Sequence, residues 1–145
     1  MSVNSSIYPI IGTFVGVALG AWLARNTAFK IVDRQEKNRD FLALKNSFIP
    51  AMRILRKDQF TTEEFKRFPT LFENQDIAML SFVGHLGGEN RRCFDEYWNK
   101  YKEWQKEFEN LETGMENAGI VLLTSTRRPE LVKLIEDILE AAKKY

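Results

Sequence analysis

The hydrophobic pattern of the chain opens with an unbroken apolar run. Residues 7–24 contain no charged side chain, and as an α-helix these eighteen positions would extend about 27 Å, close to the hydrocarbon thickness of a bilayer. Tyr8 and Trp22 stand near the two ends, where aromatic rings favour the membrane interface. A cleaved signal peptide would need basic residues ahead of the run, and a core helix would be polar on one face. The pattern therefore predicts a transmembrane anchor within residues 1–25.

Three glycines recur at four-residue intervals inside this run, at Gly12, Gly16 and Gly20. Four residues advance slightly more than one helical turn, so the three positions form a slowly drifting groove on one face. In lipid, helices associate where small residues let their backbones approach closely. We expect these glycines to mediate self-association into a homo-oligomer. The alternatives are packing against an unrelated partner, or simply the high frequency of glycine in membrane helices.

Charge divides the remainder of the chain into a basic and an acidic part. Residues 25–57 carry nine Lys/Arg against three Asp/Glu, whereas residues 68–145 carry ten against fourteen. The positive-inside tendency then places the N-terminus outside and the C-terminal domain in the cytoplasm. Residues 33–40 have no apolar side chain, so residues 26–40 are expected to form a charged helical stalk or linker.

From residue 41 the apolar positions follow a helical period, although several breaks interrupt it. Pro50 predicts a break or kink near Ile49. Thr61 and Glu64 have the spacing of a capping box for a short helix ending at about residue 68. A further short helix is expected over residues 77–86, stopped by the glycine pair at 87–88. In the segment that begins at residue 41, one helix face carries the apolar residues Phe41, Leu44, Phe48, Met52 and Leu55.

The longest amphipathic segment covers residues 89–111. Its aromatic stripe is typical of the core of a small bundle and carries Phe94, Tyr97, Trp98, Tyr101, Trp104, Phe108 and Leu111. Residues 112–119 read as a connector, and "GIVLLTS" could be a short strand but has no convincing partner strand. Pro129 opens a last amphipathic helix. The fold class is therefore all-α, with one N-terminal transmembrane helix followed by a small cytosolic bundle of about five helices over residues 41–145.

Little in the sequence indicates catalysis. Single copies of Cys93 and His85 exclude an internal disulfide, a thiolate cluster and a paired-imidazole site. The sequence has no Walker-type phosphate loop, metal-ligand spacing or serine nucleophile elbow, and its paired carboxylates are adjacent, so they diverge on a helix. We therefore expect no enzyme activity, no metal and no cofactor. The near balance of 21 basic and 20 acidic side chains argues against general nucleic-acid binding.

One constellation could bind an anion. Thr126, Arg127 and Arg128 immediately precede the last helix, whose free N–H groups would attract negative charge while arginine supplies bidentate contacts. The alternative is that the hydroxyl caps the helix and the arginines pair with acidic neighbours. Arg91 and Arg92 form a secondary candidate, which could equally meet lipid headgroups.

Residues 41–101 contain "FLALKNSFIPAMRIL", "DIAMLSF" and "FDEYWNKY". On these packing motifs the chain loosely resembles small bacterial membrane-anchored helical proteins without an assigned function, which implies a bacterial inner-membrane location. Its architecture is also similar to that of membrane effectors of bacterial antiviral signalling, including type III CRISPR systems, in which a cytosolic domain senses a nucleotide and perturbs a membrane span.

Two functions follow as hypotheses. The first is a non-enzymatic single-pass membrane protein that self-associates through its glycine-spaced helix, while its cytosolic domain binds a protein partner or a small anionic ligand. The alternative is a nucleotide-gated, membrane-disrupting effector of antiviral defence. The alternative requires a closed oligomer, because one isolated helix cannot enclose a pore.

Overall fold

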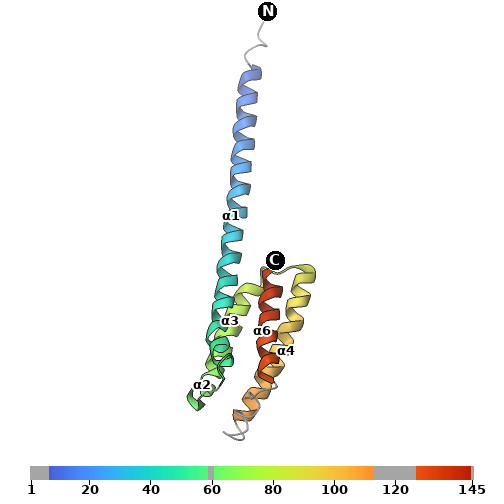
Figure 1. Cartoon of the computed structure of the whole chain (residues 1–145). Coiled ribbons are helices and arrows are strands. Elements are labelled where there is room, and N and C mark those ends of the chain that lie inside the picture. The colour runs from blue at the N-terminus through green and yellow to red at the C-terminus, as the bar shows by residue number, and fades with distance from the viewer. Residues whose placement is uncertain (1–6, 59–60, 113–126, 145) are drawn as a thin grey trace, which may run out of the picture. The chain divides into compact units, whose positions relative to one another are not determined.

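The computed structural model describes residues 7–58, 61–112 and 127–144, with side chains described over 15–58, 61–110 and 127–144. Every regular element in these ranges is helical: α1 (Ile7–Leu55), α2 (Thr62–Lys66), α3 (Phe68–Val83), α4 (Gly88–Glu112) and α6 (Arg127–Lys143) (Figure 1). The chain divides into two compact units, Met1–Asn38 and Arg39–Tyr145. The prediction of an all-α fold is confirmed for the described residues. The connector at 112–119 falls outside them after residue 112, as does the whole "GIVLLTS" segment.

The first helix differs from the prediction of separate segments. The apolar run, the charged stretch and the segment from residue 41 belong to one helix, α1, so the predicted helix count is wrong. No glycine or proline interrupts residues 25–40, so no helix-breaking residue stands there. Asp33 and Lys37 form an i,i+4 ion pair at 3.0 Å, which favours the helix.

The predicted helix break near Ile49 is also wrong, because α1 continues through Pro50 to Leu55. A proline inside a helix costs about 3 kcal/mol, since it removes one backbone hydrogen bond and crowds the preceding turn. The turns on either side of Pro50 bury Phe48, Ala51 and Ile54 to 5% exposure or less. Burying side chains of this kind stabilises by about 1.5–3 kcal/mol for each large one, which offsets the cost of the proline.

The short helix α2 starts as predicted. The Thr61 hydroxyl accepts a hydrogen bond from the Glu64 N–H at 3.2 Å, and the Glu64 carboxylate accepts one from the Thr61 N–H at 3.0 Å, which completes the capping box. The separate helix expected at 77–86 is instead the second half of α3. Gly88, with φ of +53°, begins α4 in a conformation that side chains rarely adopt.

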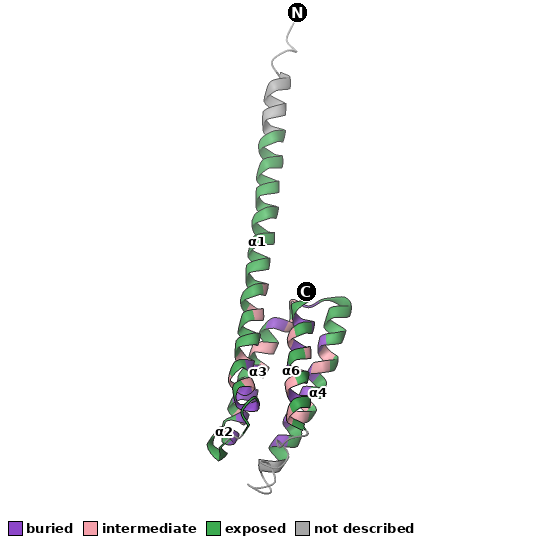
Figure 2. Cartoon of the chain, viewed as in Figure 1, coloured by how far each residue is buried: buried purple, intermediate pink, exposed green. Residues whose placement is uncertain are grey.

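The core of the second unit is mainly aromatic. Helices α4 and α6 lie along one another, and their inward faces are buried (Figures 1 and 2). Ring contacts link α1, α3 and α4: Phe48 lies 5.5 Å from Tyr101, and Phe72 lies 5.4 Å from Phe108, centroid to centroid. The six aromatic residues of the stripe expected on residues 89–111 therefore form core or pack against it, as the sequence indicated, and the side chain of Leu111 lies outside the described ones. The largest fully buried side chains include Leu44, Phe48, Phe68, Phe82, Phe94, Tyr101, Leu131, Ile135 and Ile138.

Candidate functional site

The first unit presents an apolar helix surface, and none of its residues from 15 to 38, where side chains are described, is buried. The large apolar side chains of α1 between residues 15 and 32 are all at least half exposed: Val15, Val17, Leu19, Trp22, Leu23, Phe29, Ile31 and Val32. Figure 2 shows this part of α1 as uniformly exposed. Within the part of the chain that the structure describes, no helix combines the length and the apolarity needed to cross a membrane.

The predicted packing glycines lie in this same unit. A Cβ atom added at Gly16 or Gly20 would meet nothing within 4 Å, so the groove that they form is open in a single chain. Gly12 precedes the residues whose side chains are described. Near Gly20, Trp22, Asn26 and Phe29 line a shallow hollow in which the Arg25 guanidinium lies 5.5 Å from the centre of the Phe29 ring. This pairing of an arginine with aromatic rings is typical of a cation–π contact.

The arginines predicted to bind an anion already have partners. The Arg127 guanidinium forms an ion pair with Glu107 of α4, and the Arg128 guanidinium donates to the backbone carbonyls of Lys57 and Asp58. These contacts connect the start of α6 to α4 and to the segment after α1. Thr126 lies outside the described residues. An anion at this position would therefore have to compete with existing internal bonds.

The two arginines of the secondary candidate differ in their surroundings, because Arg91 is bonded within the chain and Arg92 is exposed. The Arg91 Nε donates to both carboxylate oxygens of Asp95 at 2.9 and 3.0 Å, and its Nη1 donates to the Val83 carbonyl at 3.2 Å. Arg91 thus holds the turn between α3 and α4. Arg92 is exposed, and its charge helps to lower the pKa of Glu96, after the larger effect of the hydrogen bond from Lys100.

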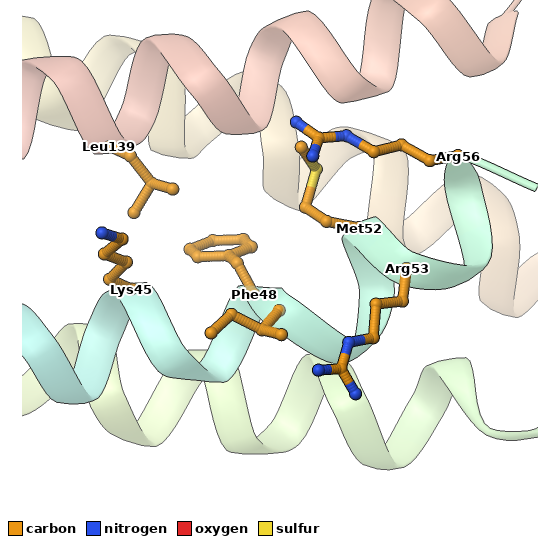
Figure 3. A pocket seen from close by; sticks show the side chains of 7 residues that line it. Lys45, Phe48, Met52, Arg53, Arg56 and Leu139 are labelled. Carbon is orange, nitrogen blue, oxygen red and sulfur yellow. The ribbon is translucent and has the colours of Figure 1, made fainter.

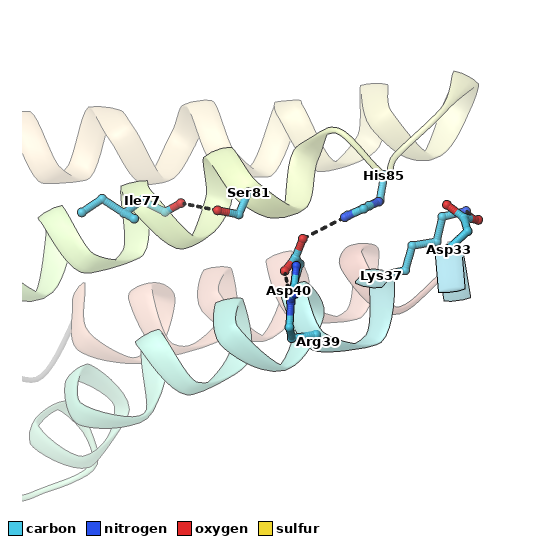
Figure 4. A network of polar contacts seen from close by, with 7 residues as sticks. All are labelled: Asp33, Lys37, Arg39, Asp40, Ile77, Ser81 and His85. Atoms are coloured by element: carbon cyan, nitrogen blue, oxygen red, sulfur yellow. Dashed lines mark hydrogen bonds and ion pairs between the residues drawn. The ribbon is translucent and has the colours of Figure 1, made fainter. Parts of the chain in front are cut away.

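The single histidine joins α1 to the turn after α3. His85 Nε2 lies 2.9 Å from Asp40 Oδ2, with side-chain exposures of 18% and 15%, and Arg39 Nε donates to the other oxygen of Asp40 at 3.1 Å (Figure 4). The hydrogen bond from His85 is the main cause that lowers the pKa of the Asp40 carboxyl below its usual 3.8, and Arg39 adds to it.

We expect Asp40→Asn to lower the free energy of unfolding by about 1 kcal/mol near neutral pH, because the charged partner of His85 is lost. Since the folded protein lowers the pKa of Asp40, the wild-type advantage should be complete above pH 3.8 and disappear as pH falls through the folded value. Chemical unfolding followed by circular dichroism at several pH values measures this difference. In a His85→Phe background the effect of Asp40→Asn should shrink markedly; an unchanged effect would show that the pair is not its source.

A buried polar cluster lies between α1, α3 and α4 and was not predicted. The Tyr101 hydroxyl donates to Gln75 Oε1 at 2.5 Å, and Gln75 Nε2 donates to the Ser47 carbonyl at 3.4 Å. Burial raises the pKa of the Tyr101 phenol well above its usual range, so the hydroxyl stays a donor at every physiological pH. A lone glutamine in a polar stretch gives no signal in the sequence that it will be buried. The cluster specifies how the three helices meet.

A groove between α1 and α6 was also not predicted. It encloses about 320 Å³ and is lined by Lys45, Phe48, Ile49, Met52, Arg53, Arg56 and Leu139 (Figure 3). Arg56 pairs with Glu136 of α6 at 3.2 Å. Within the described residues, neither Lys45 nor Arg53 has an ion-pair partner. The basic excess over residues 25–57 indicated the positive charge of this groove. It did not indicate that Leu139 of α6 lies beside these side chains.

Comparisons of the chain with protein-family models, with curated proteins and with solved structures find no match. The resemblance to small bacterial membrane-anchored helical proteins, and the architectural likeness to antiviral effectors, therefore stay predictions.

Proposed function

We propose that this protein is a non-enzymatic single-pass membrane protein. Its α1 helix anchors it and associates with copies of itself through Gly12, Gly16 and Gly20, and its helical domain, Arg39–Tyr145, binds a protein partner or a small anionic ligand on the cytoplasmic side. The observation that carries the proposal is the apolar surface of α1 around Leu19 and Trp22, which is more than half exposed in the single chain.

A helix that is apolar all round is stable only where lipid or other helices cover it. The second unit buries its own apolar residues in an aromatic core, whereas the large apolar residues of the first unit between positions 15 and 32 are at least half exposed. The basic side chains that follow, from Arg25 to Arg34, support the proposed orientation. Gly16 and Gly20 have free space beside them, which supports the approach of a second helix.

The self-association is tested by Gly16→Leu in full-length protein purified in detergent. A leucine has room on the single helix, so the variant should keep its fold, but its side chain would separate two backbones that meet at this position. We expect the dissociation constant of the oligomer, measured by analytical ultracentrifugation, to rise about tenfold or more.

Val17→Leu is the matched control, because it enlarges a side chain on another face of the same helical turn. It should leave the oligomer unchanged. An oligomer that is equally stable in Gly16→Leu would contradict the glycine interface while leaving the anchor itself in place.

The ligand-binding part of the proposal is supported by those cations of the second unit, such as Lys45, that have no ion-pair partner among the residues whose side chains are described. The nucleotide-gated effector places its ligand at Arg127 and Arg128, whose guanidiniums contact Glu107 and backbone carbonyls. A panel of cyclic oligonucleotides added to the same ultracentrifugation samples separates the two functions. A nucleotide-dependent change in oligomer size would favour the effector.

A further inference from the structure

We propose that the groove between α1 and α6 binds a free single-chain anionic amphiphile of the fatty-acid type, with its carboxylate on Lys45 and its alkyl chain along Ile49, Met52 and Leu139. This inference rests on the proposed function, which includes a small anionic ligand, and it names the chemical class of that ligand and the place where it binds.

The shape of the groove suits an elongated ligand. Lys45 lies on α1 and Arg56 directly follows the last residue of that helix, eleven positions later, which corresponds to about 16 Å along the helix axis. Figure 3 shows Phe48 and Met52 between them, with Leu139 facing them from α6. The enclosed volume of about 320 Å³ is at the lower end of the range for small-molecule sites. The lining between the two charged ends is therefore mainly apolar.

The charges give the ligand a direction. Arg56 is neutralised by Glu136 at 3.2 Å, so an added carboxylate at that end would meet an existing negative charge. Lys45, at the other end, has no ion-pair partner among the described residues, and its amine lies close to Leu139 in Figure 3. Arg53 also lacks such a partner there, but its side chain points away from α6 in the same view. An anionic head would consequently bind at Lys45 and the chain would extend toward Met52.

The apolar lining also needs a cover. Ile49 is 40% exposed, and Met52 and Leu139 are only partly buried although they pack against the core. An alkyl chain would remove this surface from water without requiring hydrogen bonds. An inorganic anion would pair with Lys45 but leave the apolar lining exposed, and an uncharged alkane would cover the lining but leave Lys45 unpaired. An amphiphile with one negative head does both.

The test uses full-length protein in phosphatidylcholine nanodiscs and a dodecanoate that carries a photoactivatable diazirine near the end of its chain. After irradiation, mass spectrometry of peptides locates the label. We expect saturable labelling of the α1 peptide containing Met52 or the α6 peptide containing Leu139. Lys45→Glu should raise the half-saturating concentration at least tenfold, because an attractive contact becomes repulsive. Lys45→Gln should raise it less.

Two controls make the result specific. Lys106→Glu makes the same charge change at an exposed position of α4 and should leave labelling unchanged. The methyl ester of the probe keeps the chain but lacks the charge and should bind at least tenfold more weakly. Equal saturation by acid and ester, an unaltered Lys45→Glu variant, or label confined to residues 15–24 would each overturn the inference. The mass of the particles, measured on the same samples, reports self-association separately, so failure of the groove and failure of the proposed function are distinguishable.

Discussion

Replacing Val15 and Leu19 together with arginine is expected to release the protein from membranes. Both side chains are more than half exposed on α1, so the change breaks no packing within the chain. Each arginine near the centre of a membrane helix costs about 2.5–3.5 kcal/mol, and two should reduce insertion by several thousandfold. Flotation of membranes on a density gradient, with immunodetection of the floating fraction, measures the effect.

The matched control places two arginines at Leu42 and Leu80, which are also more than half exposed but belong to the second unit. This variant should float with the membranes like the wild type. If both double variants float equally, the apolar part of α1 is not the anchor and the proposed function fails at its first step.

The second large effect concerns stability. Phe72→Ala should lower the free energy of unfolding by about 3–5 kcal/mol, because the ring is 3% exposed and its loss leaves a cavity between α3 and α4. The ring centroid of Phe72 lies 5.7 Å from that of Phe68, 6.1 Å from Tyr101 and 5.4 Å from Phe108. One substitution therefore removes edge-to-face contacts to Tyr101 and Phe108 together with a tilted contact to Phe68.

Urea unfolding followed by the near-ultraviolet circular dichroism of the aromatic core measures this loss. Leu80→Ala, on the same helix but 68% exposed, is the control and should change the free energy of unfolding by no more than about 0.5 kcal/mol. Similar losses in both variants would show that the aromatic core does not determine the stability of the domain.

The parts of the fold that were predictable from the sequence depend on local chemistry. The capping box of α2 needs only Thr61 and Glu64, three positions apart, and the core face of α4 follows from the helical spacing of Phe94, Trp98 and Tyr101. Residues that are close in the sequence determine where α2 begins and which face of α4 is buried, so the sequence pattern is sufficient to predict both.

The errors arose where distant residues decide the outcome. Pro50 predicts a break by its own chemistry, but the burial of Phe48 and Ala51 against other helices keeps α1 continuous. The surroundings of the candidate site also depend on distant residues. Arg128, which the sequence predicts to bind an anion, donates to the carbonyls of Lys57 and Asp58, about 70 positions earlier. The groove beside Lys45 depends on Leu139, and no spacing in the sequence connects these two residues.

The central claim is that α1 inserts into a bilayer and associates there with copies of itself. The most direct test is the mass of the full-length protein extracted with a small membrane patch by a styrene–maleic acid copolymer, measured by native mass spectrometry. We expect one defined oligomer that survives dilution. A monomer at every concentration, or protein recovered without lipid, would contradict it.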